Sequence, residues 1–337
     1  MSAWQPIDTA PRDGTDIILG YAGSHSEEGR WMGDPSRNHW RETGWFASTD
    51  DVLCDHPKRP TGSRCRRRRR TERMADTTGI AWTDATFNPW WGCTKVSPAC
   101  DFCYAERDSK RYGFDLWGPG KQRRFFGDKH WNEPRRWSAK GPRKVFCASM
   151  ADVFDNEVAQ EHRERLWALI RETPNLTWQV LTKRIGNAPK MLPADWGSGY
   201  PNVWLVITVI NPAEIARDVP KLREVPARTK GLSVEPQLEA VDAPAGIDWI
   251  ITGGESGHRA RPYRVEWARR LIDQGRSTGQ AIFVKQLGAN PDIGKLKHRA
   301  GADPAEWPED IRVRQFPAAP ARETEERSAV DIARARA

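Results

Sequence analysis

The chain has 337 residues, 38% of them hydrophobic and 17 of them tryptophan, so it can bury a sizeable core. This composition excludes a disordered polymer, because indole rings are large apolar surfaces that need burial. The net charge of +8 says little about the main domain, because residues 64–73 (RCRRRRRTER) contain seven arginines and one glutamate and supply +6 of it.

Residues 1–48 predict a small β-rich domain, with short apolar stretches separated by Gly, Pro, Asp and Ser turns. The phrases WQPIDTAPRDGT, GRW and GWF resemble a small domain of unknown function common in phage and prophage proteins, which implies no activity. Residues 49–76 have no periodicity and are rich in arginine, so we expect a disordered linker. Met74 is expected to mark the ancestral start of the main domain, with the upstream part fused to it or mis-annotated.

Short apolar runs rich in β-branched residues recur along residues 77–316, and helical patterns separate several of them. The predicted strands are Ala85–Trp91, Lys144–Ser149, Trp178–Thr182, Val203–Val209, Gly231–Val234, Trp249–Thr252 and Ala281–Lys285. The clearest predicted helices are Glu157–Glu172 and Val265–Gln274. Strands that are apolar throughout and separated by helices are typical of a parallel sheet covered on both sides. The predicted fold class is therefore α/β, a full or partial (β/α) barrel, with a doubly wound open sheet as the alternative.

The charged tail, residues 317–337, is low in large apolar residues and is expected to be disordered. The sequence offers no run of about 20 apolar residues that would predict a membrane span. Its first residues, MSAWQPIDTAPRDG, lack the pattern of a secretory signal. Six cysteines without an export signal indicate a reducing, cytoplasmic location, where thiols bind metal or react rather than pair. The oligomeric state stays open.

Polar residues follow the predicted strands, where barrel folds place their chemistry on one rim. They include Asp152, Asp155, Thr182, Lys183, Arg184, Thr208, Asn211, Glu235, Gly253, Gly254, Glu255, Ser256, Lys285 and Gln286. Lys183 and Arg184 suit a carboxylate or phosphate ligand, although a salt bridge to Asp152 or Glu235 explains them equally well. Arg259 and Arg261 are further candidates for contact with a phosphate.

Three cysteines, Cys93, Cys100 and Cys103, lie within eleven positions in the spacing C-x6-C-x2-C. Thiolates bind both zinc and iron–sulfur clusters. A structural zinc site usually has four protein ligands, and the fourth here would be Cys147 or a distant histidine such as His130. Cys147 lies inside an apolar run, so it is interpreted as a small buried hydrophobic residue rather than a ligand.

The three cysteines resemble those of the radical S-adenosylmethionine (radical SAM) superfamily, in which three thiolates hold a 4Fe–4S cluster and the fourth iron chelates SAM. The commonest motif there is C-x3-C-x-aromatic-C. Here Phe102 precedes Cys103 and Tyr104 extends an aromatic wall, but the first gap is six residues. A closer resemblance, over about residues 77–288, is to a phage and prophage three-Cys-motif family of unknown function. It is carried by the phrases IAWTDATFNPWWGCTKVSPACDFCYAE, FCASMADVFD, VLTKR, GLSVEPQLE, WIITGGESGHRARP and FVKQLG.

This resemblance implies a radical-SAM-like barrel enzyme with a 4Fe–4S cluster and SAM as cofactors and an external electron donor. Such an enzyme reductively cleaves SAM to a 5′-deoxyadenosyl radical, which removes hydrogen from a substrate. The implied metal ligands are Cys93, Cys100 and Cys103. The implied cofactor-binding residues are Ser149, Asp152, Thr182, Lys183, Glu235, Gly253, Gly254 and Glu255. The last three match the superfamily's GGE element in composition but come late in the chain, so a tight strand-to-loop turn is the alternative.

The sequence identifies neither the substrate nor a catalytic residue. A nucleic acid or nucleotide is favoured by association with phage proteins and with the basic linker. The alternative function is a nucleic-acid-binding protein with a structural metal site that contacts phosphates through residues 64–73. A barrel that has lost catalysis and keeps its cluster as a structural element is a third possibility.

Overall fold

The computed structural model describes residues 78–318. The predictions for the N-terminal domain (1–48), for the linker (49–76) and for all but the start of the charged tail lie outside the described residues. None of the helices within residues 78–318 combines the length and the apolar character needed to cross a membrane.

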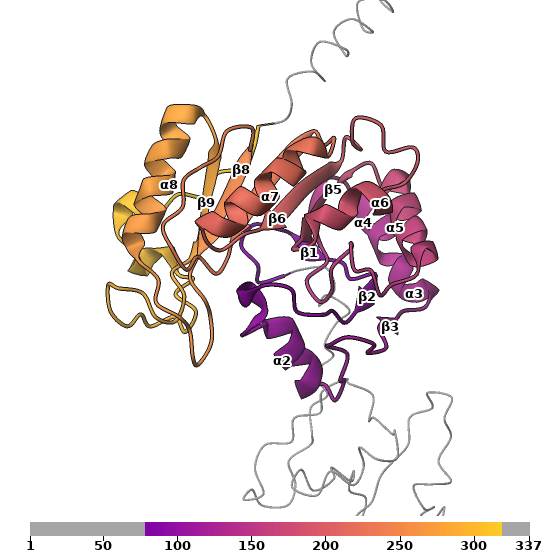
Figure 1. Cartoon of the computed structure of the whole chain (residues 1–337), viewed down its shortest axis with the longest axis horizontal. Helices are drawn as coiled ribbons and strands as arrows, with labels where there is room; N and C mark the ends of the chain where they lie inside the picture. Colours follow the sequence, from indigo (N-terminus) through magenta and orange to yellow (C-terminus); the bar gives the residue numbers. More distant parts are fainter. Residues whose placement is uncertain (1–77, 319–337) are drawn as a thin grey trace, which may run out of the picture. The chain divides into compact units, whose positions relative to one another are not determined.

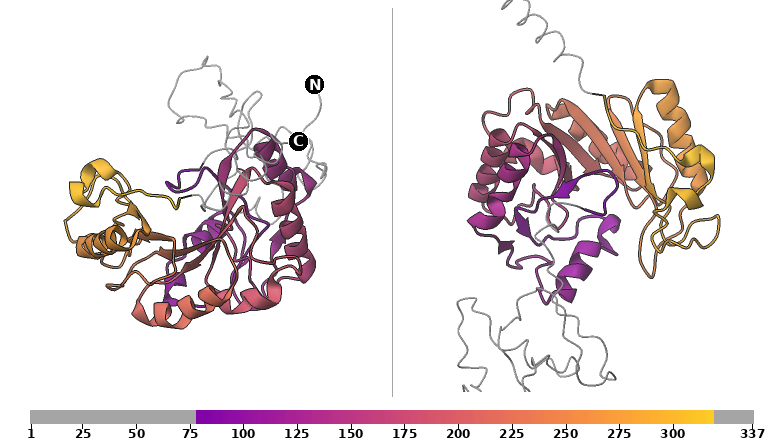
Figure 2. Two further views of the ribbon diagram at one scale, coloured as in Figure 1. Left: turned by 90° about the horizontal axis from the view of Figure 1, so that it is seen from above. Right: turned by 180° about the vertical axis from the view of Figure 1, so that it is seen from behind.

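Seven parallel strands form one sheet in the order β1-β4-β5-β6-β7-β8-β9. They are β1 (Ala85–Thr86), β4 (Arg143–Cys147), β5 (Leu176–Thr182), β6 (Val203–Thr208), β7 (Thr229–Val234), β8 (Trp249–Gly253) and β9 (Ala281–Gln286). The sheet curves but stays open between β1 and β9, with helices outside the curve (Figure 1, Figure 2). Spatial order follows chain order without the reversal of a doubly wound sheet. The predicted partial (β/α) barrel is therefore confirmed.

The helices connect consecutive strands or precede them. They are α2 (Tyr104–Arg111), α3 (Asp128–Trp131), α4 (Glu133–Ala139), α5 (Gln160–Glu172), α6 (Ala188–Met191), α7 (Pro212–Glu224) and α8 (Val265–Thr278). Single turns of 3-10 helix lie at Pro98–Cys100, Ile185–Asn187, Pro304–Glu306 and Glu309–Ile311. A separate antiparallel pair joins β2 (Trp90–Trp91) to β3 (Arg124–Phe125). The predicted strand Ala85–Trp91 is thus divided between two sheets.

The two faces of the sheet pack against different material. Alternate strand side chains pack with apolar residues of α5, α7 and α8, including Leu166, Leu222 and Leu271. The opposite, inner face carries a smaller aromatic cluster in which Trp82 packs among Phe146, Val206, Trp249, Ile251 and Phe283. The sequence predicted cover on both sides, but α5, α7 and α8 cover only the outer face.

Polar side chains take over the inner face at the carboxyl ends of the strands. Lys183, Thr208 and Lys285 come two positions after Leu181, Val206 and Phe283, all members or neighbours of the aromatic cluster. Because side chains alternate along a strand, each of these polar residues continues the inner face beyond the apolar cluster. The segment between β2 and α2 that carries Cys93, Cys100 and Cys103, here called the cysteine segment, lies at this edge of the inner face, at the carboxyl ends of the strands.

Candidate functional site

A cavity of about 110 Å³ lies at the carboxyl ends of β4, β5 and β6. All three cysteines of the segment between β2 and α2 line it, and so do Thr94 and Lys95, the latter paired with Glu106. The polar lining from the sheet and its connections is Ser149, Asp152, Thr182, Lys183, Arg184 and Thr208. The structure therefore brings together the three predicted metal ligands and four of the eight predicted cofactor contacts. The other four, Glu235, Gly253, Gly254 and Glu255, do not line this cavity.

The donor set of this cavity fits a cluster held by three thiolates. No fourth thiol and no imidazole from residues 78–318 lines it. Cys147, the last residue of β4, is buried in the main core, and the His130 ring stacks on Phe87, so neither lies where a fourth ligand would be needed. The four cysteines in residues 78–318 are unpaired. Within the same residues, however, no three Cys, His, Asp or Glu side chains converge closely enough to hold a metal ion. The three thiols are thus the right ligands for such a cluster and line one cavity, but in this structure their sulfur atoms do not converge on a single metal position.

Arg184, the residue that follows Lys183 after β5, connects Cys93 to the sheet. Its Nη1 donates to Cys93 Sγ at 3.2 Å and lies 3.3 Å from Asp152 Oδ2, and its Nη2 donates to the Thr94 carbonyl. Burial, and then the charge of Asp152, raise the pKa of the Cys93 thiol to about 11, while Arg184 opposes both. The salt-bridge interpretation of Arg184 is therefore confirmed, and its partner is Asp152.

Asp152 lines the cavity, but both of its carboxylate oxygens are bonded within the protein. Its Oδ1 accepts from Thr182 Oγ1 at 2.8 Å and from the Phe154 amide at 3.0 Å, and its Oδ2 accepts from the Lys183 amide at 2.9 Å. Thr182 Oγ1 in turn accepts from the Arg184 amide. Asp152 and Thr182 thus set the direction of the guanidinium that reaches Cys93.

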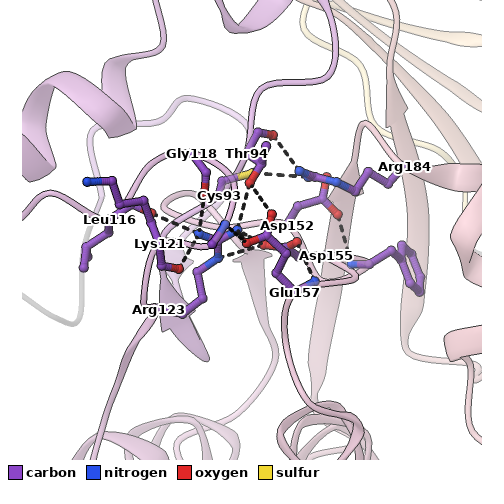
Figure 3. A network of polar contacts seen from close by, with 12 residues as sticks. Cys93, Thr94, Leu116, Gly118, Lys121, Arg123, Asp152, Asp155, Glu157 and Arg184 are labelled. Carbon is purple, nitrogen blue, oxygen red and sulfur yellow. Dashed lines mark hydrogen bonds and ion pairs between the residues drawn. The ribbon is translucent and has the colours of Figure 1, made fainter.

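Arg123 fixes the beginning of the cysteine segment from the other side (Figure 3). Its side chain is 2% exposed, forms an ion pair with Asp155 at 3.0 Å and donates to Thr94 Oγ1 at 3.0 Å. Further bonds reach the carbonyls of Leu116, Gly118 and Lys121. Thr94 Oγ1 also donates to Glu157, whose second oxygen accepts from the Gly120 amide. The sequence reasoning missed Arg123, because the stretch KQRRFF carries no periodicity and does not distinguish it from neighbouring arginines.

The far half of the cysteine segment is held by helix α7 and by the connection between β8 and α8. Ser97 Oγ donates to Glu214 Oε1 of α7 at 2.7 Å. Arg261 donates to the Pro98 carbonyl at 3.1 Å and lies 3.6 Å from Asp101. The Arg261 side chain also donates two hydrogen bonds to Glu255, at 2.6 Å and 3.0 Å, and its amide donates a third at 3.0 Å, so Glu255 acts on the segment through Arg261. Glu214, which the sequence reasoning also missed, lies in the first turn of α7, where its amide donates to the N-cap residue Asn211, and only tertiary pairing reveals its role.

Only one of the two aromatic residues beside Cys103 lines the cavity. Tyr104 does, and its hydroxyl donates to the Ser149 carbonyl at 3.0 Å. Phe102 is 38% exposed, and the guanidinium groups of Arg259 and Arg261 lie over its ring at 5.3 and 5.2 Å. Of the two residues expected to form an aromatic wall beside the cysteines, only Tyr104 does so.

The late Gly-Gly-Glu phrase has a packing role in this structure. A Cβ on Gly254 would lie within van der Waals overlap of the Leu287 carbonyl oxygen, and the Gly254 amide donates to the Gln286 carbonyl at 3.0 Å. A Cβ on Gly253 would lie 2.8 Å from Glu235 Oε1. The two glycines thus let the end of β8 approach β9 and Glu235 closely.

Two lysines lie at the inner edge of the sheet, and only one of them has a carboxylate partner among the described residues. Lys285 Nζ forms an ion pair with Glu235 Oε2 at 3.0 Å, and Glu235 Oε1 is buried without a hydrogen-bond partner among the described residues. Lys183 Nζ lies 3.4 Å from Thr208 Oγ1, and no carboxylate within residues 78–318 comes within ion-pair distance of it. Ser149 Oγ accepts from Asn88 Nδ2 at 3.0 Å. In the described part of the chain, the cavity therefore holds one ammonium group without a protein counter-ion.

The family described as "Protein of unknown function (DUF5131)" matches residues 77–316, and the chain belongs to this family. No match was found among curated proteins. Among solved structures, a spore photoproduct lyase with a cysteine-to-serine substitution is similar, with 14% identity and a TM-score of 0.40 over 62% of this chain and 76% of that one. A spore photoproduct lyase complexed with dinucleoside spore photoproduct has 12% identity and a TM-score of 0.37 over 61% of this chain and 65% of that one.

Proposed function

We propose that this member of the DUF5131 family is an iron–sulfur enzyme that reductively cleaves SAM and acts on a further substrate. One observation carries the proposal. Three thiols of one segment, Cys93, Cys100 and Cys103, line a single cavity at the carboxyl edge of a parallel sheet, and no fourth thiol or imidazole of the described residues lines it. A three-thiolate donor set is what a 4Fe–4S cluster with one iron open to a small molecule needs.

In this proposal the three cysteines bind the cluster and the inner edge of the sheet binds SAM. When bound, the cluster and SAM supply reductive cleavage of a carbon–sulfur bond to give a 5′-deoxyadenosyl radical, with the electron coming from an external donor. Lys183, the ammonium group without a counter-ion in the described residues, binds the carboxylate of the methionine part, and Thr208 supports it. Ser149 offers a hydroxyl beside Tyr104.

In the proposed enzyme, most of the remaining predicted residues position other side chains or the backbone rather than binding SAM themselves. Asp152 and Thr182 orient Arg184, and Glu255 orients Arg261. Glu235 lies further along the same inner edge and is paired with Lys285. In the proposed enzyme it contacts the amino group or the ribose of SAM. Gly253 and Gly254 let the end of β8 come close to Glu235 and β9. The apolar lining of Phe146, Leu181 and Trp117 excludes water and strengthens each charged contact.

The proposed substrate class is a nucleic acid or nucleotide. The support is the arginine run at residues 64–73, which suits phosphate binding by counterion release. Deleting this run should weaken salt-dependent binding to an oligonucleotide while the cluster remains.

Anaerobically reconstituted and reduced full-length protein is expected to release 5′-deoxyadenosine from SAM. Lys183→Met should weaken SAM binding in equilibrium dialysis, whereas Lys190→Met, on the exposed part of α6, should leave it unchanged. Cys93→Ala should abolish both the visible chromophore and SAM cleavage and leave oligonucleotide binding intact. A protein that binds oligonucleotide but neither binds nor cleaves SAM would instead support a nucleic-acid-binding protein with a structural metal.

A further inference from the structure

We infer that Arg184 is a positioning residue for Cys93, which makes one of the three proposed sulfur ligands electronically different from the other two. The inference rests on the proposed function, because its effect appears only when Cys93 binds iron. It assigns Arg184 a measurable influence on the reduction potential of the cluster.

The first support is the geometry of the guanidinium. Nη1 donates to Cys93 Sγ at 3.2 Å, and the neighbouring Nη2 donates to the carbonyl of the next residue, Thr94. A planar guanidinium has donors fixed in one fork, so two bonds to consecutive residues set both the position and the direction of the chain at Cys93. A lysine ammonium, a single point charge on a flexible stem, cannot reproduce both at once.

The second support is that Arg184 is itself held rigidly by the sheet. Its side chain is 6% exposed and is paired with Asp152. Asp152 is fixed by Thr182 Oγ1, at the last position of β5, and by the Lys183 amide directly after it. The orientation of the guanidinium is therefore determined by the sheet and not by the cysteine segment.

The third support is the difference between the three sulfurs. Of the side chains in residues 78–318, only that of Arg184 donates a hydrogen bond to a sulfur of Cys93, Cys100 or Cys103, and the sulfur that accepts it is that of Cys93. Hydrogen bonds to cluster sulfurs and nearby positive charge raise the reduction potential, because the reduced cluster carries one more negative charge. The difference between Cys93 and the other two cysteines is therefore imposed by the fold, through the hydrogen bond from Arg184.

The test compares wild type with Arg184→Gln and Arg184→Lys, using full-length protein reconstituted anaerobically with iron and sulfide. Arg269→Gln is the matched control, because Arg269 pairs with Asp310 on the surface of α8, away from the cavity. The readouts are iron per chain, thermal midpoint, and the midpoint potential from a redox titration followed by electron paramagnetic resonance.

Arg184→Gln is expected to lower the midpoint potential by about 59 mV, which is a tenfold change in the one-electron equilibrium. Arg184→Lys keeps the charge opposite Asp152, so it should fold if the glutamine variant does not, and should shift the potential in the same direction by less. Loss of iron from a variant that still melts like the control also supports the inference.

Normal iron content with the wild-type potential in both Arg184 variants would overturn the inference and leave the proposed function standing. Wild-type protein that binds no iron would overturn the proposed function and the inference with it.

Discussion

Ser97 and Glu214 are separated by 117 positions in the sequence and share a hydrogen bond of 2.7 Å from Ser97 Oγ to Glu214 Oε1. Arg184 makes an equivalent long-range connection at Cys93, and Arg261 makes another at Pro98. These anchors come from three different connections of the sheet. The segment that carries the three cysteines is therefore preorganised by the barrel, and not merely attached to it.

Removing the Glu214 anchor should destabilise the fold. Glu214→Ala leaves Ser97 Oγ and the buried Ile210 amide without their acceptor, at a cost of about 1–3 kcal/mol for each such group. Ser97→Ala removes the connection to α7 and the hydrogen bond from the Ala99 amide, which is not buried as deeply as Ile210, and should cost roughly 1 kcal/mol. Chemical denaturation of both variants measures the difference. Equal losses would contradict the stabilising role given to the bond from the Ile210 amide, and no loss in Ser97→Ala would show that Glu214 stabilises α7 alone.

Arg123 should be among the most sensitive positions of the site. Arg123→Met leaves the fully buried Asp155 carboxylate without its partner, which costs about 3–5 kcal/mol for a buried pair. Arg136→Gln, at an exposed position of α4, is the matched control and should change the free energy of unfolding by less than about 0.5 kcal/mol. Urea denaturation measures the free energy of unfolding of both variants. A loss below about 1 kcal/mol at Arg123 would contradict the structural role given to it.

Gly92, directly before Cys93, should not tolerate a side chain. Its φ is +113°, and a Cβ would lie 2.8 Å from both the Leu116 carbonyl oxygen and Arg123 Cδ. Gly113 also has a positive φ, +83°, but no atom lies within 4 Å of its Cβ position. Gly113→Ala should therefore cost only the backbone strain, about 1–2 kcal/mol, and Gly92→Ala clearly more. Thermal midpoints that fall equally would show that the close contact at Gly92 relaxes freely.

The stabilising effect of Glu157 should depend on pH. Hydrogen bonds from Thr94 and then from the Gly120 amide lower the pKa of Glu157 in the folded protein. Its contribution is therefore present above the unfolded value of about 4.3 and is lost as the pH falls through the lower folded pKa. The difference in thermal midpoint between wild type and Glu157→Gln should shrink as the pH is lowered from about 6 to about 3.5. A difference that stays constant would contradict this assignment.

The strands were predictable because each is a run of apolar residues buried on both faces. All six long strands of the sheet, β4 to β9, lie within a few positions of the sequence prediction. The predicted strand Ala85–Trp91 is two short strands in the structure, because Pro89, between β1 and β2, has no amide N–H to donate to a neighbouring strand. Helix α7 was not predicted, since Pro212 and Pro220 favour a loop, although Pro212 takes the first position after the cap residue Asn211.

The centre of the site was predictable and its support was not. Parallel strands bring their carboxyl ends to one edge, so Ser149, Asp152, Thr182 and Lys183 meet the cysteines as expected. Arg123, Glu214 and Arg261 support the segment through contacts between parts distant in sequence, and no local pattern indicates such contacts. Gly253 and Gly254 match a ligand-binding element in composition, and the close approach of β8 to β9, which sequence alone does not indicate, also requires them to be glycine.

The most direct test of the central claim is the metal content of the anaerobically reconstituted protein. The proposed enzyme should be brown and bind about four irons and four sulfides per chain. Alanine variants of Cys93, Cys100 and Cys103 should each lose the cluster, whereas Cys147→Ala should keep it. A colourless protein that holds one zinc per chain, or iron that survives removal of all three cysteines, would contradict the account.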